Sequence, residues 1–438
     1  MFRNRVSFKS WSVFLMIILG FSCLSGCAGE SGQSGKSLLI WHWMTDRQQA
    51  FDELAKRYEA AYGVKVNFDL YAPSDAYSQK VRAAAQGVNL PDVFGILAEK
   101  RDFAAFVEAG HILDLTYYMD ENAGQWRNVF FAKALQINEF PAGNIYKVAP
   151  GIYGVPIDTM TIQLVYNKDL FRKMGLDPAK PPVTFSEFIG IAKKIKENNL
   201  QGLVSGWGEY WLIDCFANNY AFNLMGQDKV LATIKGQVPY TDPDWIKVLA
   251  LFKDMRDSGL LYSGAIAMVN KDAEQAFANE KAVFAFNGSW CVNVYKEMNP
   301  KLNYGVMLPP KISDKYPVSI WGGAGSSFMV NARSAKKDEA VKFLKWLTAK
   351  EQQVYLSEAT NNLPANKESL NTIPKILSAF AKNIDYTTHP NIWGVSEFPL
   401  VVEALDKGIQ SIIIGEKTPE QVAQEVQRTK EKEIAKKR

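Results

Sequence analysis

The stretch that decides the fold is residues 151–176, GIYGVPIDTMTIQLVYNKDLFRKMGL. Pro156 interrupts regular structure near its start, and the apolar run at 162–166 predicts a short strand. The polar triplet 167–169 then opens an amphipathic helix, which Gly175 ends. Loop, strand, turn and helix in this order are typical of α/β proteins.

Strand and helix patterns also alternate before this stretch. In chain order the predicted strands and helices are 38–43, 46–62, 64–70, 75–85, 93–97 and 101–109. Such alternation favours an α/β lobe with a largely parallel sheet. Further on we predict helices at 185–198, with Thr184 as the N-cap, and at 244–257, and helical patterning dominates from 374. Strands are predicted at 281–286, 304–308 and 327–330, and an aromatic segment at 206–220 has no assigned element.

The first 26 residues have the pattern of a secretory signal peptide. Arg3, Arg5 and Lys9 precede an apolar run at 11–21 that is too short to remain in a bilayer as a permanent helix. The cleavage region Leu24-Ser25-Gly26-Cys27 resembles a bacterial lipobox, so we expect Cys27 to be lipidated and to become the new N-terminus. The alternative is an ordinary secretory signal with a chance cysteine.

Residues 27–36 form the lipidated cysteine and a tether rich in Gly and Ser, which is typical of a flexible linker. The whole chain of 438 residues has a net charge of +4, and removal of the signal peptide leaves +1. Basic residues are dispersed, so nucleic acid is not an expected partner.

Cysteine and histidine usage predicts no metal site and no nucleophilic catalysis. Cys215 and Cys291 remain after processing, and two buried thiols are a simpler interpretation than a disulfide. The three histidines, at 42, 111 and 389, are far apart and lack metal-ligand spacing. No nucleophile-elbow motif is present, and we expect no cofactor.

Several short motifs occur along the chain in a fixed order. They are the strand 38–43 with its helix, Pro91-Asp92-Val93, Pro156-Ile157-Asp158, Tyr166-Asn167-Lys168-Asp169-Leu170, Asn287-Gly288-Ser289-Trp290, Gly305-Val306 to Pro309, and Leu363-Pro364-Ala365. On a lipoprotein, this ordered set resembles the family 1 extracellular solute-binding proteins, which feed sugar-importing ABC transporters and include the maltodextrin-binding proteins. Gln163 departs from the family pattern, which prefers a small residue there.

The resemblance implies an α/β, type II-like periplasmic-binding-protein fold of two lobes, with the ligand cleft between lobes joined by a three-segment hinge. The crossings fall near 154–158, 308–311 and 362–365, in segments rich in Pro and Gly. The predicted N-terminal lobe is 37–157 with 311–362, and the C-terminal lobe is 158–310 with 363–438. The resemblance also implies a monomeric, extracytoplasmic binding protein that meets ABC permease subunits and is held to the membrane by lipid on Cys27.

A sugar receptor needs aromatic planes for the C–H faces of the ring and planar polar groups for the hydroxyls. The chain has 11 Trp, several of them where the resemblance places the cleft. Trp290 follows a predicted strand through a tight turn, and a Trp in this Asn-Gly-x-Trp setting stacks on the ligand in the resembling maltodextrin-binding members. The predicted ligand-binding residues are Trp43, Asp46, Arg47, Glu99, Asp158, Trp207, Glu209, Trp211, Asn287, Trp290, Trp321, Gly322 and Trp393.

Each of these residues also has a structural interpretation. Aromatic residues are often core, and acids near turns are often helix caps or solvated charges. Two carboxylates facing a sugar would also suit a glycoside hydrolase. A surface lectin would use the same aromatic planes without lobe closure. The ligand itself, whether a monosaccharide or an oligosaccharide, stays open at this point.

Overall fold

The structure, a computed structural model, describes residues 37–97 and 100–436. The predicted signal peptide, Cys27 with the tether, and Glu99 lie outside the described residues. The strands are β1 (Ser37–His42), β2 (Lys65–Leu70), β3 (Val93–Gly95), β4 (Glu139–Phe140), β5 (Gly151–Ile152), β6 (Val155–Asn167), β7 (Gln201–Val204), β8 (Ala282–Gly288), β9 (Tyr304–Met307), β10 (Ile320–Val330), β11 (Leu363–Pro364) and β12 (Thr387–Thr388).

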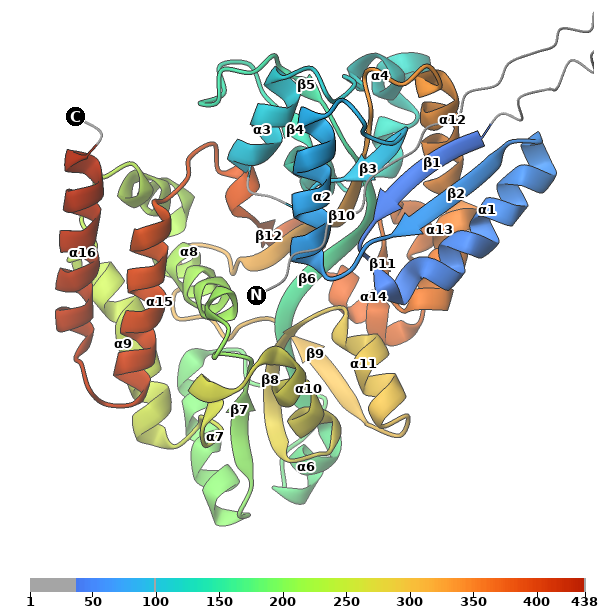
Figure 1. Cartoon of the computed structure of the whole chain (residues 1–438). Helices are drawn as coiled ribbons and strands as arrows, with labels where there is room; N and C mark the ends of the chain where they lie inside the picture. Colours follow the sequence, from blue (N-terminus) through green and yellow to red (C-terminus); the bar gives the residue numbers. More distant parts are fainter. Residues whose placement is uncertain (1–36, 98–99, 437–438) are drawn as a thin grey trace, which may run out of the picture. The chain divides into compact units, whose positions relative to one another are not determined.

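Helices cover both faces of the sheet that these strands build (Figure 1). They are α1 (Gln48–Tyr62), α2 (Ser74–Gln86), α3 (Lys100–Glu108), α4 (Thr116–Gly124), α5 (Ala132–Ile137), α6 (Lys168–Lys173), α7 (Phe185–Glu197), α8 (Tyr210–Ile234), α9 (Pro243–Ser258), α10 (Asn270–Ala278), α11 (Cys291–Met298), α12 (Lys337–Leu347), α13 (Lys350–Thr360), α14 (Lys375–Ala381), α15 (Pro399–Ile413) and α16 (Pro419–Ala435). Short 3-10 turns, such as Thr45–Arg47 and Pro390–Ile392, join them.

The long strand β6 is the centre of the sheet, whose order among the described residues is β2-β1-β3-β10-β6-β8-β7. Its first half pairs with β10 and β11, and its second half pairs with β8 and β9. We predicted only 162–166 as a strand here. The strand starts earlier because all of residues 155–161 except Met160 are buried, with β10 along one side and β11 beside 158 and 159.

The sheet is mixed, so the expectation of a largely parallel sheet holds only for its ends. Parallel pairs join β1 to β2 and β3, and β7 to β8. Between them β10 runs antiparallel to both β3 and β6, and β6 runs antiparallel to β8. The sequence pattern of strand and helix did not indicate this reversal because β10 returns from a distant part of the chain.

Helix α8 is the longest of the elements that the sequence patterns missed. It begins inside the aromatic segment, and it is broken at Gly226, where φ is +73° and an added Cβ would lie 2.6 Å from the ring of Tyr316. Most residues between 212 and 226 are buried, on all sides of the helix. A helix that is buried all round has no amphipathic period, so its pattern does not distinguish it from a strand or a loop.

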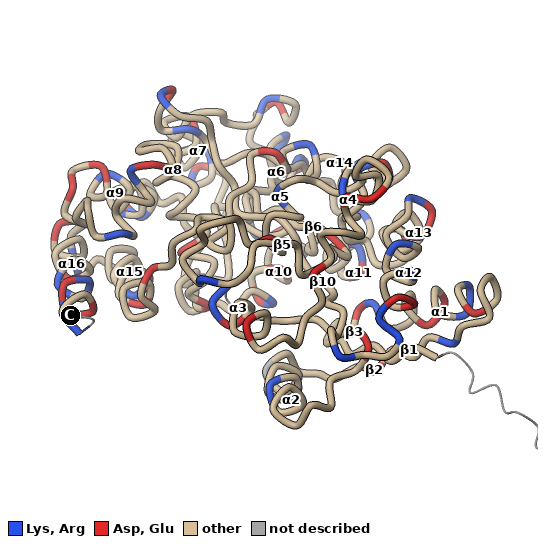
Figure 2. Tube along the Cα trace, turned by 90° about the horizontal axis from the view of Figure 1, so that it is seen from above, with Lys and Arg blue, Asp and Glu red and all other residues tan. Residues whose placement is uncertain are grey.

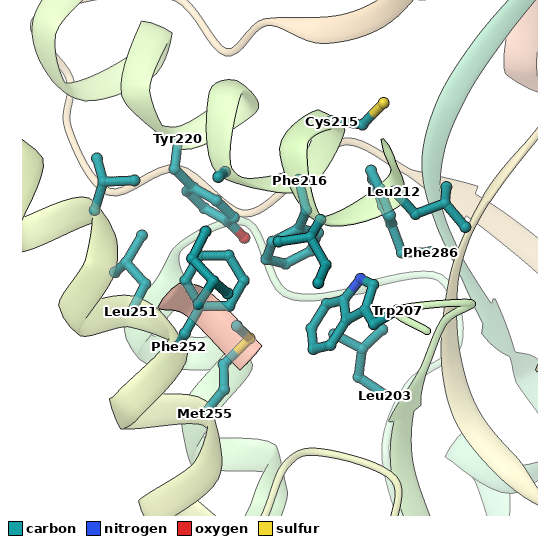
Figure 3. Packing of buried hydrophobic residues seen from close by; sticks show 14 of the residues in the cluster. Leu203, Trp207, Leu212, Cys215, Phe216, Tyr220, Leu251, Phe252, Met255 and Phe286 are labelled. Carbon is teal, nitrogen blue, oxygen red and sulfur yellow. The ribbon is translucent and has the colours of Figure 1, made fainter. Parts of the chain in front are cut away.

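The largest core surrounds α8 and packs it against α9, α15 and the second half of β6. Figure 3 shows Trp207, Phe216, Tyr220 and Phe252 meeting inside this cluster. A second core packs β1, β2 and part of β10 against α1 and α12. Both predicted free thiols, Cys215 and Cys291, are unpaired and buried, which confirms that interpretation.

Gln163, the position that departs from the family pattern, has a structural role. Its side chain is fully buried, and its Nε2 donates to the carbonyl of Phe380 at 2.9 Å. Its Oε1 accepts from Nδ2 of Asn383 at 2.8 Å. The amide therefore ties β6 to the end of α14, a contact that a small residue does not make.

Charged residues of both signs alternate along the helices (Figure 2), as the dispersed basic residues of the sequence predicted. Among the described residues, no helix has the length and apolar character that crossing a bilayer requires.

Asn223 on α8 donates to the carbonyls of Ser313 and Tyr316, at 3.1 and 2.8 Å, so the beginning of the predicted 311–362 segment lies against α8.

Candidate functional site

An aromatic group lies where β10 begins. The ring centroids of Trp321 and Trp393 are 5.9 Å apart, and those of Trp321 and His389 are 5.4 Å apart. The strand β12 brings the later residues here, because it pairs in parallel with the first two residues of β10. Trp393 Nε1 donates to Thr388 Oγ1 at 2.6 Å, which fixes the indole while part of it stays exposed.

A cavity of about 380 Å³ lies beside these rings. Aromatic walls with a few convergent polar groups are the usual composition of a small-molecule site. The aromatic walls include Tyr240, Trp245, Trp321 and Trp393, and the polar ones are Lys100, Asp214, Asn218, His389, Asn391, Ser396 and Glu397.

Two more cavities adjoin the first. One, of about 220 Å³, shares His389 and Asn391 with it and adds Trp43 and Met160. The other, of about 580 Å³, shares Lys100, Asn391 and Trp393. Three predicted residues, Trp43, Trp321 and Trp393, are therefore brought together around His389 and Asn391, although they come from distant parts of the chain.

Two bases in these walls, the buried Lys100 and the half-buried His389, have lowered pKa values. Burial lowers the pKa of His389 to about 4, and the nearby Lys100 acts in the same direction. The backbone N–H of Asn391 donates to His389 Nδ1 at 3.1 Å, so the neutral ring carries its proton on Nε2 and can donate it. Lys100 donates to the carbonyls of Ile137 and Glu139 at 2.5 and 2.8 Å, and burial lowers its pKa to about 7.

Two acidic residues, Asp214 and Glu397, also line the first cavity. Glu397 accepts from Tyr240 at 2.9 Å and from Nζ of Lys430 at 2.5 Å. Asp214 accepts from Nδ2 of Asn218 at 2.8 Å. Burial raises the pKa of Asp214, and the charge of Glu397 acts in the same direction. The residues of this wall therefore include both hydrogen-bond acceptors and hydrogen-bond donors, and the hydroxyl groups of a sugar can bind to either kind.

A second aromatic group stands at the end of β8. The ring centroids of Trp211 and Trp290 are 5.9 Å apart, with an interplanar angle of 45°. Trp290 Nε1 donates to Glu274 at 3.1 Å, and Trp211 Nε1 donates to Glu209 at 3.1 Å. Trp211 is 43% exposed, and Trp290 is half-buried, so both rings keep open surface.

The two aromatic groups lie at the same level of the sheet. Trp321 on β10 is opposite Ile162 on β6, which is opposite Gly288 on β8. Because neighbouring strands are about 4.8 Å apart, the Cα atoms of Trp321 and Gly288 are about 10 Å apart. Trp290 and Trp393 both pack against the core that contains Ile162, so they stand on one face of the sheet.

Arg47 and Asp158, both predicted to contact the ligand, contact each other instead. Arg47 Nη1 pairs with Asp158 Oδ2 and donates to Ser326 Oγ at 3.0 Å. Asp158 Oδ1 accepts from the backbone N–H of Ser326 at 2.7 Å. The guanidinium and carboxylate side chains are 11% and 4% exposed, so this pair holds the first loop against β6 and β10. Asp46 beside them is exposed and accepts from Asn362 Nδ2 at 3.0 Å.

Trp207 lies in the core and presents no surface. It is completely buried, and its ring packs edge-on against Phe216 and Phe252 (Figure 3). Trp207 follows strand β7 and lies in the same core cluster as Leu203 of that strand and Leu212 at the start of α8. The interpretation of this residue as core, and not as a ligand contact, is therefore the better one.

Three other predicted residues support their neighbours. Asn287 is buried and donates to Glu274 at 3.0 Å, and Glu209 accepts from the backbone of Asn270 at 3.0 Å. Gly322 lies in β10, where an added Cβ would lie 2.4 Å from the carbonyl of Met160. That close approach of β6 and β10 explains the glycine.

Sequence patterns did not indicate several residues of these walls. His389, Asn391, Lys100 and Asp214 line the cavities, and Glu274 holds Trp290. The only usable signal was the isolated His389 four residues before Trp393, within a Pro- and Asn-containing loop. Asn391 lies in the same loop, whereas Lys100, Asp214 and Glu274 lie in helices, and only the tertiary fold brings these three to the sites.

A family model of bacterial extracellular solute-binding proteins matches residues 53–386. The chain belongs to this family. The solute-binding protein is 24% identical over 355 residues to a multiple sugar-binding protein of Streptococcus mutans, with 78% of each chain covered. It is 25% identical over 432 residues to a putative binding protein of Brucella abortus, with 94% of this chain and 96% of the relative covered.

Solved structures of the same architecture match almost the whole solute-binding protein. The apo form of RafE from Streptococcus pneumoniae superposes with a TM-score of 0.74 at 16% identity, covering 91% of this chain and 98% of that one. A chitin oligosaccharide binding protein gives a TM-score of 0.72 at 22% identity, covering 92% and 100%. The prediction of the two-lobe periplasmic-binding-protein fold is thereby confirmed. The family and these neighbours are binding proteins and not enzymes.

Proposed function

We propose that this solute-binding protein captures a sugar or oligosaccharide outside the cytoplasm and delivers it to the permease subunits of an ABC importer. The observation that carries the proposal is that the pair Trp321 and Trp393 lines one cavity together with Asp214, Asn218 and His389. Flat rings beside convergent donors and acceptors match the two kinds of surface of a sugar. The similar Streptococcus mutans protein is itself described as a multiple sugar-binding protein.

The proposed ligand contacts are Trp43, Trp321 and Trp393, with His389, Asn391 and Asp214 as the polar partners. Trp211 and Trp290 form a second platform at the same level of the sheet, which favours an oligosaccharide over a single ring. Asp46, Glu209, Asn287 and Gly322 act indirectly in this proposal, through the residues that they hold. Glu99 stays a candidate contact, next to Lys100 in the sequence.

Closure of two lobes around the sugar is the proposed mode of capture. Pro364 pairs with Asp158, which supports two adjacent crossings, at 154–158 and 362–365. The contact of residues 313–316 with α8 favours a second crossing slightly beyond the predicted 308–311. The proposed N-terminal lobe is then 37–157 together with 311–362 without the first few residues of that second segment. The proposed C-terminal lobe is 158–310 together with 363–438. A sugar that touches both lobes favours the closed state by its additional contacts.

A thermal-shift screen over a sugar library tests the proposal. A ligand that binds only the folded state stabilises it by about 2.7 kcal/mol at a hundred times its dissociation constant. We expect at least one sugar to raise the melting temperature in a concentration-dependent way, and sugar alcohols of similar size without a ring to have no effect. Absence of any shift across neutral, amino and acidic oligosaccharides would contradict the proposal. New reducing ends after incubation with the bound oligosaccharide would instead favour a glycoside hydrolase.

We further propose that Cys27 anchors the mature monomer to the outer face of the membrane. The diacylglyceryl group of a lipoprotein supplies two acyl chains, and two chains hold stably where one does not. The Cys27→Ala variant is therefore expected to move from the membrane fraction to the soluble fraction, as an immunoblot of fractionated cells would measure. A Cys23→Ala variant is the matched control and should stay with the membranes. Retention of Cys27→Ala in membranes would refute the anchor.

A further inference from the structure

Trp290 is held by an acidic side chain that the sequence motifs do not include. Glu274 is only 6% exposed, and its Oε1 accepts from Nε1 of Trp290 at 3.1 Å. The same oxygen accepts from Nδ2 of Asn270 at 2.8 Å and from Nδ2 of Asn287 at 3.0 Å. These donors come from the start of α10, from β8 and from the residue before α11, so the carboxylate joins three elements.

The backbone of Gly288 supports the indole from behind. A Cβ added at Gly288 would lie 1.8 Å from Cζ3 of Trp290 and 2.1 Å from Cη2, so the ring lies directly against this glycine. The neighbouring ring of Trp211 is 5.9 Å away. Trp290 is thus fixed on one face by packing and at its nitrogen by a hydrogen bond, while it remains half-buried.

The chemistry of Glu274 fits this role, because its carboxylate receives the Trp290 N–H together with two amide N–H groups. A carboxylate only accepts hydrogen bonds, so it can serve three donors at once without offering a donor of its own. No ion pair of Glu274 with a lysine or arginine is found among the described residues. Buried carboxylates are normally paired with a cation or fully hydrogen-bonded, and here one of the hydrogen bonds belongs to an aromatic ring.

We propose that Glu274 is a positioning residue for the sugar site, which acts by holding the Trp290 indole in the orientation that receives a sugar ring. This inference rests on the proposed function. A flexible indole must be ordered when a sugar binds, and that ordering reduces the affinity. The hydrogen bond to Glu274 lowers the free energy needed to order the indole on sugar binding, because the ring is already fixed in the unliganded protein.

A double-mutant cycle with raffinose and chitotriose as probes tests the inference. Glu274→Ala is expected to weaken the affinity for a bound probe about tenfold, whereas Glu274→Gln, which keeps one acceptor oxygen, should stay within about threefold. In the Trp290→Phe background, whose ring has no N–H to hold, Glu274→Ala should add less than a twofold loss. Equal losses in both backgrounds would overturn the inference, because Glu274 would then act independently of Trp290.

A second readout needs no sugar. In protein labelled with 5-fluorotryptophan, the ¹⁹F resonance assigned to Trp290 by its absence in Trp290→Phe should be sharp in the parent and shifted or broadened in Glu274→Ala. An unchanged Trp290 resonance would refute the positioning role even if the affinity falls. If the parent binds neither probe while the resonance responds as expected, the positioning of Trp290 stands and the choice of sugar in the proposed function is what fails.

Discussion

Replacing Trp393 by alanine is expected to weaken sugar binding by about 30-fold and to lower the melting temperature only slightly. The indole packs at the edge of the cavity, with its ring centroid 5.9 Å from that of Trp321, and it is only partly covered. Removing an aromatic anchor from a binding site typically costs at least about 2 kcal/mol of binding free energy, which corresponds to that factor. Isothermal titration with the sugar found in the screen measures it.

Trp207→Ala is the matched control, because the same substitution is made in the core of the same lobe. Trp207 is completely buried against Phe216 and Phe252, so its removal should lower the free energy of unfolding by about 3 to 5 kcal/mol. The protein that remains folded should bind sugar normally. If Trp393→Ala instead unfolded the protein and Trp207→Ala only weakened binding, the assignment of the two residues would be reversed.

Arg47→Met is expected to destabilise the protein by about 3 to 5 kcal/mol, because it leaves the buried carboxylate of Asp158 without its cation. The double variant Arg47→Met with Asp158→Asn should recover most of this loss. An asparagine oxygen can still accept from the backbone N–H of Ser326, which now donates to Asp158 at 2.7 Å. Urea unfolding followed by fluorescence gives the free energies of the parent and of the two variants.

The same variants separate a structural from a ligand-binding role for Arg47. In the account given above, the double variant binds sugar nearly as well as the parent, because neither side chain faces the ligand. A stable Arg47→Met protein that had lost its sugar affinity would restore the sequence-based interpretation of Arg47 as a ligand contact.

Local features of the fold were predictable because their causes lie within a few residues. Thr184 was expected to cap the helix after it, and it does so with a capping box in which Glu187 returns a hydrogen bond. Asn167 caps α6, at the turn expected from the polar triplet. The ends of β1, α1 and α9 likewise lie within a few residues of the predicted ends.

Features that depend on burial were harder to predict. The strands β6 and β10 are longer than expected, and α8 was missed, because segments that are buried on almost every side show no regular alternation of polar and apolar positions. Trp207 and Trp211 are four residues apart, with similar neighbours in the sequence, yet one is completely buried and the other 43% exposed. Composition indicates that such residues matter but not which way they face.

The candidate site also combines features that were predictable from the sequence with non-local features that were not. The residue types that a sugar needs were visible in the sequence, and Trp43, Trp321 and Trp393 do line adjoining cavities. His389 and Lys100 were not predicted as partners, because 289 positions separate them and only the return of the chain through β12 brings them together. The Arg47 and Asp158 pair is also non-local, with 111 positions between the two residues, so each was interpreted separately as a ligand contact.

A crystal structure of the protein with the tightest-binding sugar of the screen would locate the ligand. We expect a sugar ring on the faces of Trp321 and Trp393, with hydroxyls within hydrogen-bond distance of His389, Asn218 or Asp214. A sugar bound elsewhere, for example in the polar groove between α1 and α13 that Asp46, Asp52 and Arg57 line, would contradict the proposed site.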